Sequence, residues 1–227
     1  MKTIIGVIML IMMTTLSYAN DIYVTQSGNA LDLDITQDGE NNTVGNSTTA
    51  SASTGATTIL NIDQIGNSNV ITYQINGATY TGVINLVGSS NNVDLNCDST
   101  GGNSSCGTAN AVINFTGSSN DIDLDIGQTS SANTADVDIV GQSGSDSNVV
   151  AATVDGNSAV LTITVNGDTN NYLIDIDGNG DSVGHTLIHS HTGGIADVDI
   201  IQSGTNDNMI TLTTSGDNAD IDISQTD

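Results

Sequence analysis

Apolar and polar residues alternate in short runs along almost the whole chain. The stretch at 30–42, ALDLDITQDGENN, is typical, because leucine and aspartate take turns before a polar segment ends the run. A period of two predicts a β-strand with one buried face, and none of the runs has the 3.6-residue period of an amphipathic helix. The runs expected to form strands lie at 22–26, 31–37, 58–64, 70–75, 82–87, 92–97, 110–116, 121–128, 135–140, 148–154, 159–165, 171–177, 185–191, 196–202, 208–213 and 219–225.

The runs recur at a nearly constant spacing. Gly, Asn, Ser and Asp separate them, and toward the C-terminus a pair of runs repeats about every 22–25 residues. That period is typical of solenoids, in which each rung buries its apolar face only by stacking on its neighbours. The sequence therefore predicts an all-β fold, a repeat β-solenoid of stacked strand–turn–strand rungs.

Strand parity assigns a glutamine to the apolar face of many runs. In 31–37, both leucines and Ile35 share a face with Gln37, opposite Asp32 and Asp34. A lone buried amide costs about 1–3 kcal/mol, whereas identical amides stacked rung on rung satisfy one another. The alternative is that Gln only marks a strand end. The amide residues predicted to form stacked ladders are Gln26, Gln37, Asn42, Gln64, Asn69, Gln128, Gln142, Gln202 and Gln225.

Several runs are followed by Gly-x-x-Asn. The motif begins at Gly39, Gly66, Gly88, Gly117 and Gly167. Glycine permits a positive φ in a turn, and Asn satisfies local backbone groups or tolerates a left-handed conformation. We expect these segments to be the turns between strands.

Charge narrows the range of functions. The chain has 26 Asp and Glu residues, and its single basic residue is Lys2. Binding of nucleic acid, of anionic lipid or of nucleotide phosphates requires cationic side chains, so these partners are not expected. The acidity favours divalent cations, cationic surfaces or a salty medium.

The first 19 residues have the pattern of a secretory signal peptide. Lys2 supplies a charged start, 4–13 an apolar segment and 17–19 (SYA) a small-x-small cleavage site. A membrane-spanning helix is the alternative, but the apolar segment is shorter than the ~20 residues that a bilayer needs. Cleavage after residue 19 would leave a chain without any Lys or Arg, and we expect it to be secreted to the cell surface or the extracellular space.

Two cysteines bracket a polar loop. Cys97 and Cys106 flank DSTGGNSS, and in a secreted chain such a pair predicts a disulfide. A metal or redox pair is the alternative, although no C-x-x-C spacing supports it.

The outward aspartates are candidate cation ligands. In-register stacking would place carboxylates about 5 Å apart, where like charges repel unless Ca²⁺ or salt intervenes. No cofactor is required by the sequence, and Ca²⁺ is the one that it suggests, against the alternative of a solvated acidic face. The candidate ligands are Asp32, Asp34, Asp121, Asp123, Asp125, Asp136, Asp138, Asp175, Asp177, Asp197, Asp199, Asp220 and Asp222.

The three histidines lie within seven residues, at His185, His189 and His191, and parity puts them on one face. A transition-metal site, an outward polar position and a pH-sensitive surface all remain open. Catalysis is not expected, because the paired carboxylates are explained by the repeat and no nucleophile elbow or HExxH motif is present.

The motifs resemble the curlin repeats of curli-type extracellular amyloid fibres. The pattern Gln-x-Gly-x-x-Asn occurs at 37–42 (QDGENN) and 64–69 (QIGNSN), and with one extra residue at 142–148 and 202–208. The Ala and second Gln that normally follow are mostly missing. The resemblance implies cross-β rungs and subunits that add end to end into fibres of an adhesive or biofilm matrix, so the expected partner is the chain itself.

The expected organisation is a signal peptide at 1–19, a leading repeat at 20–42, a Ser/Thr-rich linker at 43–57 and the repeat domain at 58–227. A leading rung detached by the linker would be free to dock on another subunit. A simple loop excursion is the alternative. The rival functions are a non-polymerising acidic adhesin or calcium-binding surface module and, from Thr162/Thr164 and Thr211/Thr213, an ice-binding face.

Overall fold

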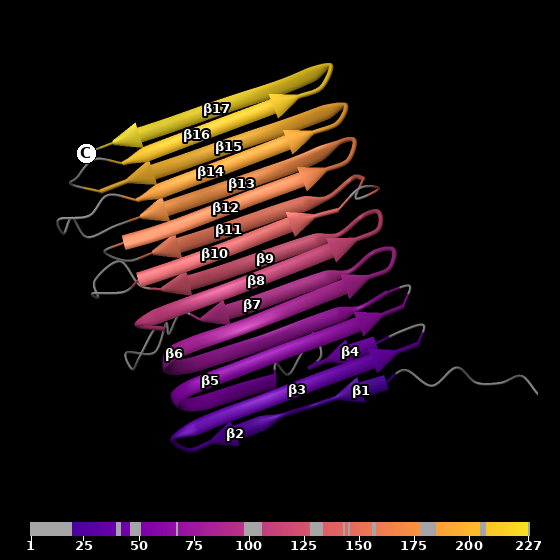
Figure 1. Cartoon of the computed structure of the whole chain (residues 1–227), viewed down its shortest axis with the longest axis vertical. Coiled ribbons are helices and arrows are strands. Elements are labelled where there is room, and N and C mark those ends of the chain that lie inside the picture. Colours follow the sequence, from indigo (N-terminus) through magenta and orange to yellow (C-terminus); the bar gives the residue numbers. More distant parts are fainter. Residues whose placement is uncertain are drawn as a thin grey trace, which may run out of the picture.

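The protein is a stack of β-strand rungs built along one axis (Figure 1). The computed structural model describes residues 20–39, 42–45, 51–66, 68–97, 106–127, 134–142, 144, 146–155, 158–177, 185–204 and 208–226. The predicted signal peptide at 1–19, Gln128 and the loop at 98–105 lie outside these residues.

Two faces of parallel strands make up the stack. Face 1 contains β3 (Ala30–Asp38), β8 (Thr108–Thr116), β10 (Thr134–Gly141), β12 (Ser158–Asn166), β14 (Thr186–Thr192) and β16 (Met209–Ser215). Face 2 contains β1 (Asn20–Ile22), β2 (Thr25–Ser27), β4 (Asn42–Val44), β7 (Asn92–Cys97), β9 (Asp121–Gly127), β11 (Val149–Asp155), β13 (Asn170–Asp177), β15 (Ile195–Ser203) and β17 (Asn218–Thr226). The long strands β5 (Ser51–Ile65) and β6 (Val70–Val87) begin on face 2 and continue onto face 1. The predicted all-β solenoid is confirmed.

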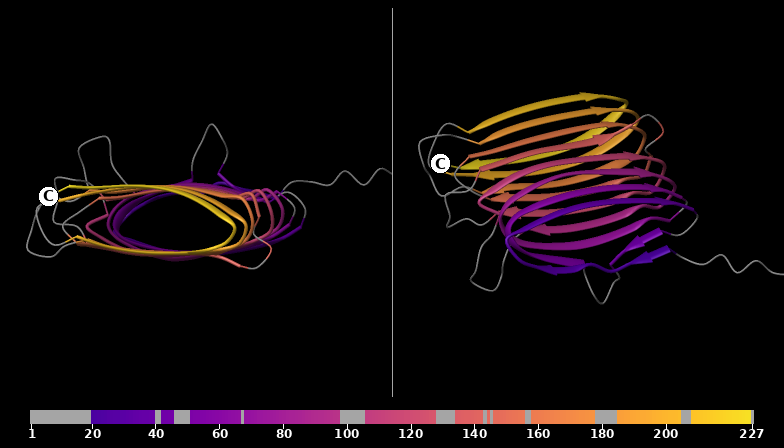
Figure 2. Two further views of the ribbon diagram at one scale, coloured as in Figure 1. Left: turned by 90° about the horizontal axis from the view of Figure 1, so that it is seen from above. Right: turned by 60° about the horizontal axis from the view of Figure 1, so that its bottom comes forward.

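Viewed along the axis, the rungs trace a flattened ring whose two long sides are the faces (Figure 2). Each strand pairs in parallel with the equivalent strand one rung away, so residues form columns along the axis with about 4.8 Å between rungs. Paired residues lie 22 to 29 positions apart, as Thr57–Thr79 and Thr79–Thr108 illustrate. The segments between strands absorb the difference in length, so the register survives an uneven repeat.

Apolar columns fill the space between the two faces. One column on face 1 consists of Ile35, Ile62, Ile84, Ile113, Ile139 and Ile163. These side chains are at most 5% exposed, and burial of each contributes about 1.5–3 kcal/mol relative to exposure. A single rung would leave every one of them in water, so neighbouring rungs are the source of stability.

The structure corrects the predicted linker at 43–57. Asn42–Val44 and Ser51–Ile65 are strands, and all nine residues of Ala30–Asp38 pair with β5. The leading rung is thus stacked on the next rung rather than detached. The Ser/Thr content of this segment misled the prediction, because Thr also suits a strand whose neighbours supply the apolar contacts.

Within the part of the chain that the structure describes, no helix has the length and apolar character to cross a bilayer.

Candidate functional site

The turns that join face 1 to face 2 contain a buried ladder of asparagines. In four successive contacts, Nδ2 of one Asn donates a hydrogen bond to Oδ1 of the Asn in the next rung, over 2.7 to 2.9 Å. The members of this asparagine ladder are Asn69, Asn91, Asn120, Asn148 and Asn170. All are at most 3% exposed. Most of the side chains use their second N–H on a turn carbonyl, as Asn120 does with Gly117 at 2.6 Å. The amides therefore tie the turns together as well as the rungs.

The asparagine ladder was only partly predicted. Asn69 was expected to stack, and it does. Asn42 is buried, but its Nδ2 donates to the carbonyl oxygens of Gln37 and Ile65 at 3.1 and 2.9 Å. The repeated Gly-x-x-Asn motif was the signal that pointed to the remaining members. It suggested hydrogen bonds to the local backbone rather than a series of hydrogen bonds between Asn side chains.

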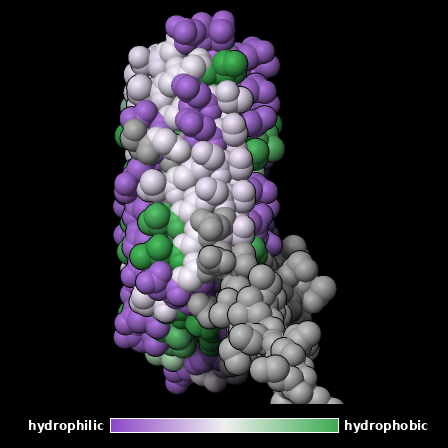
Figure 3. All heavy atoms as spheres, turned by 90° about the vertical axis from the view of Figure 1, so that its right-hand side faces the viewer, coloured by the Kyte–Doolittle hydropathy of each residue, from purple (hydrophilic) through white to green (hydrophobic). Residues whose placement is uncertain are grey.

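Glycine is needed in these turns for close approach. A methyl group on Gly88 would lie 1.7 Å from the carbonyl oxygen of Gly66, and one on Gly117 would lie 1.5 Å from that of Gly88. A positive φ also occurs at the residue before the Asn, with 65° at Ser90 and 60° at Ser119, and Gly117 itself has a φ of 128°. Glycine thus lets successive turns stack backbone on backbone. Figure 3 shows this edge, along which weakly polar residues run up the stack.

Among the described residues, the predicted glutamine ladder is formed only as two pairs. Gln64 Nε2 donates to Gln37 Oε1 at 2.6 Å, and Gln225 Nε2 donates to Gln202 Oε1 at 3.0 Å. The first column breaks at once, because Gln64 is paired with Leu86. One pair lies near each end of the stack.

The two other predicted glutamines that the structure describes, Gln26 and Gln142, do not stack on another glutamine. Gln26 is half-buried, and its Nε2 donates to the carbonyl oxygen of Ala30 at 3.2 Å. Gln142 is exposed, and Gln128 lies outside the described residues.

Most outward aspartates have a neutral neighbour in their column. Asn61 donates to Asp34 at 2.8 Å, and Asn96 donates to Asp125 at 3.1 Å. Asn92 lies 3.4 Å from Asp121 in the same arrangement. An amide opposite a carboxylate replaces repulsion by a charge-assisted hydrogen bond, which explains how acidic strands stack without basic residues.

Other predicted aspartates face hydroxyl or apolar residues. Ser203 Oγ donates to Asp177 at 2.6 Å, whereas Asp32 is paired with Ile59. Asp136 is placed between Asn110 and Val160. For Asp138 the paired residues are Val112 and Thr162, and for Asp175 they are Thr153 and Ile201. The expected continuous carboxylate columns are therefore not formed at these positions.

Within the described strands, two carboxylates are paired in register in four places. The pairs in register are Asp94–Asp123, Asp155–Asp177, Asp197–Asp220 and Asp199–Asp222. Burial, followed by the charges of Asp94 and Asp121, raises the pKa of Asp123, and burial together with Asp177 raises the pKa of Asp175. Among the described residues, no group of three or more His, Cys, Asp or Glu side chains is arranged to hold a metal ion. Calcium binding stays a prediction.

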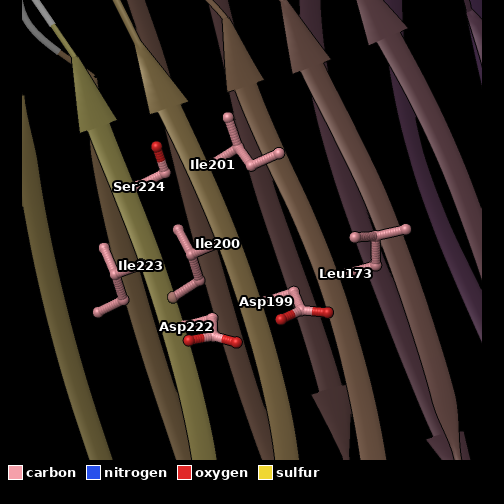
Figure 4. A pocket seen from close by; sticks show the side chains of 7 residues that line it. All are labelled: Leu173, Asp199, Ile200, Ile201, Asp222, Ile223 and Ser224. Atoms are coloured by element: carbon pink, nitrogen blue, oxygen red, sulfur yellow. The ribbon is translucent and has the colours of Figure 1, made fainter.

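Asp199 and Asp222 flank a hollow near the C-terminal end (Figure 4). The hollow has a volume of about 410 Å³, and its remaining lining residues are Leu173, Ile200, Ile201, Ile223 and Ser224. The two carboxylates lie beside each other on neighbouring strands of face 2, β15 and β17. Both aspartates of this pair are exposed.

The predicted disulfide between Cys97 and Cys106 is present, with 5.7 Å between the two Cα atoms. Both cysteines are fully buried at the bend between β7 and β8. Closing so short a segment stabilises the fold by about 2–3 kcal/mol on the chain-entropy model.

The histidines point inward. His185, His189 and His191 are at most 3% exposed, which excludes the alternative of outward polar positions. The threonine pairs do not form a regular face either, because Ile188 and Ser190 of β14 lie between those of β12 and β16.

The last rung is open. Ile221 and Ile223 of β17 are 38% and 48% exposed, although the equivalent positions one rung earlier, Val198 and Ile200, are at most 1% exposed. Ile210 and Leu212 of β16 are half-buried. An apolar face and a row of backbone groups are therefore left without a following strand among the described residues, which is the usual template for strand addition.

No protein-family model, no curated protein and no solved structure matches this chain.

Proposed function

We propose that the chain is a secreted structural subunit that stacks end to end into extracellular fibres of an adhesive or biofilm matrix, as the curlin-repeat resemblance implies. The observation that carries this proposal is the open rung of β16 and β17, which continues the columns of the first rung. The leader-like pattern at 1–19 supports export.

The columns of face 1 define what a second copy would meet. The column that starts at Leu33 ends at Ile210, and the column that starts at Ile35 ends at Leu212. A second copy that continues the stack beyond β16 in the same register thus places Leu33 over Ile210 and Ile35 over Leu212. Apolar residues meet apolar residues at both contacts.

The columns of face 2 lead to the same register for the second copy as those of face 1. The column of Ile22 ends at Ile221. The column of Gln26 passes through Ser53 and Ile75 and, one step beyond the last paired residue of β7, reaches Gln202 and Gln225. The incoming Gln26 amide would extend the pair that Gln225 and Gln202 already form. Both faces therefore accept the same copy in the same register.

Charge makes this contact conditional on the medium. The register brings Asp34 beside Thr211 on face 1 without repulsion, but on face 2 it brings Asp21 beside Asp220. The chain also has a formal net charge of −25. Long-range repulsion between copies is screened by salt, with a Debye length of about 8 Å at physiological ionic strength. We expect assembly to depend on salt or on divalent cations.

Electron microscopy and fibre diffraction of residues 20–227, with and without added salt or calcium, test the proposal. Fibres that give reflections near 4.8 Å are the expected result. Monodisperse particles at every salt concentration would contradict it.

The alternative of a calcium-binding surface module is favoured by one observation, the adjacent carboxylates of Asp199 and Asp222 (Figure 4). Calcium prefers six to eight oxygen ligands, so water would complete such a site. A calcium-dependent rise in melting temperature that is lost in Asp199→Asn/Asp222→Asn, without any fibres, would support this function instead.

A further inference from the structure

All three histidines of the chain lie in one rung near the C-terminal end of the stack. His189 and His191 are on β14, and His185 directly precedes that strand. Their inward columns are otherwise apolar on the N-terminal side, where β12 places Ile163 next to His189 and Val165 next to His191. Histidine thus occupies positions that the preceding rung fills with aliphatic residues.

Of the three histidines, His189 has the fewest contacts that could stabilise a positive charge on its ring. It is fully buried, and neither ring nitrogen has a hydrogen-bond partner among the described residues. Ile163 and Leu212 are its neighbours along the column, and the rings of His189 and Tyr172 form a T-shaped contact with 4.3 Å between centroids. None of these contacts supplies a hydrogen-bond acceptor for an imidazolium.

In the other two histidines, Nδ1 lies within hydrogen-bond distance of a neighbouring N–H or O–H group. Nδ1 of His185 accepts a hydrogen bond from the backbone N–H of Ala159 at 3.2 Å. Nδ1 of His191 lies 3.0 Å from the Tyr172 hydroxyl and 3.5 Å from Nδ2 of Asn170, the last member of the asparagine ladder. Burial raises the pKa of Tyr172, so its hydroxyl keeps its proton and is able to donate to this nitrogen. The backbone N–H of Ala159 requires an unprotonated Nδ1 on His185, and Nδ2 of Asn170 is a donor that faces Nδ1 of His191.

We infer that the buried histidines make the C-terminal rungs sensitive to acid. Their protonation unfolds β14–β17 locally, while the rungs before β12 stay folded. A protonated ring would bury a charge in an apolar column and would turn an accepting nitrogen into a donor facing another donor. This inference rests on the fold and goes beyond the proposed function, because it concerns a single molecule.

The charged groups around the histidines are few. β12 and β16, which flank β14 in the sheet, carry no titratable side chain. Asp168 raises the pKa of His191 and Asp177 raises that of His185, but burial outweighs both and lowers the two values. Burial and the neighbouring His191 lower the pKa of His189 to about 4. On β13 and β15, Asp175, Asp197 and Asp199 alternate with the buried residues and lie on the outer surface.

The sign of the pH dependence follows. Between pH 6.5 and about 4, the histidines of the unfolded chain bind protons but His189 of the folded chain does not. The free energy of unfolding therefore falls as the pH falls. The equilibrium constant for folding drops up to about tenfold per pH unit for each such histidine. The raised pKa values of Asp123 and Asp175 act in the opposite direction, because acid neutralises carboxylates whose charged form is disfavoured by burial and by neighbouring aspartates. A loss of stability in this window that disappears when the histidines are replaced therefore reports the histidines.

Unfolding of dilute, unassembled protein at pH 7.5, 6 and 5 tests the inference, with His189→Ile/His191→Val as the comparison. These substitutions copy Ile163 and Val165 of the preceding rung. The natural chain is expected to lose at least tenfold in its folding equilibrium constant between pH 7.5 and 5, whereas the variant changes by less than half as much on a logarithmic scale. Parallel losses in both proteins would overturn the inference.

A second measurement needs no variant. Ring-proton NMR of the natural chain follows its three histidines individually, and amide exchange separates β14–β17 from β5–β8. The inference requires that His189 stays neutral until the amides of β14–β17 lose protection, with those of β5–β8 still protected. Titration of all three rings near pH 6.5 in a fully protected stack would overturn it.

Discussion

The side-chain amide of Asn120 donates to Oδ1 of Asn148 across 2.8 Å, although the two residues are 28 positions apart. The same contact repeats from Asn69 to Asn170, so one directional chain of hydrogen bonds links the turns of successive rungs. Because these amides are buried, each depends on the neighbouring amides for its hydrogen bonds.

Removing a central member of the asparagine ladder should be costly. Asn120→Ala leaves Nδ2 of Asn91 and Oδ1 of Asn148 without this partner, and each orphaned buried group costs about 1–3 kcal/mol. Urea unfolding measures the loss. The control is Asn171→Ala, which removes an exposed amide next to the ladder and should change stability by less than about 0.5 kcal/mol. Equal effects of the two substitutions would contradict the role of the ladder.

The stacked turns predict an intolerance of side chains at the turn glycines. In Gly88→Ala the added carbon would lie 1.7 Å from the carbonyl oxygen of Gly66, so the turns must separate. Gly28→Ala is the matched control, because its added carbon meets only the flexible end of Gln26 at 3.1 Å. We expect a marked fall in melting temperature for the first variant and little change for the second. Similar melting temperatures would show that the turns do not need their close approach.

The open rung predicts which substitutions stop assembly. Ile223→Asp places a charge on the inward, 48% exposed position of β17, where a second copy would bury it. The concentration needed for fibre formation should rise about tenfold or more, while the isolated chain remains folded. Ser224→Asp puts the same charge on the outward side of the same strand and should have a much smaller effect. Assembly that is indifferent to this difference would exclude the proposed contact.

Charge at the junction predicts a salt-dependent gain. Asp220→Asn removes the repulsion with Asp197 in the same chain and with Asp21 of an incoming copy. At low ionic strength it should assemble faster than the natural chain, and the two rates should converge near 1 M salt, where the Debye length is about 3 Å. Asp138→Asn makes the same change in net charge between Val112 and Thr162, away from the junction. If both variants accelerate assembly equally, net charge rather than the junction controls it.

Period-two alternation made the strands, their inward and outward faces and the solenoid predictable. In the runs whose apolar residues all share one parity, alternation alone identifies the inward positions, as Ile35 and Gln37 show. The disulfide was predictable from its spacing and from the expected export.

The pairing of columns was not predictable in the same way. Which residue follows Gln64 in its column depends on where the next strand enters the rung, and the entry of β6 places Leu86 there. The segment at 43–57 was misread because strand pairing in a stack outweighs a composition that favours loops. Parity put the histidines on one face of their strand but did not show whether that face is buried, because burial depends on the packing of the whole rung.

The central claim is that copies of the chain continue the stack in register, and cysteine cross-linking tests it most directly. In Gln26→Cys/Gln225→Cys the two new thiols of neighbouring copies would lie in one inward column, whereas Gln26→Cys/Ser224→Cys aims them to opposite sides of the strand. Mild oxidation of assembled protein should give disulfide-linked chains of many subunits for the first variant and few for the second. Equal cross-linking of both variants, or none in either, would contradict stacking in this register.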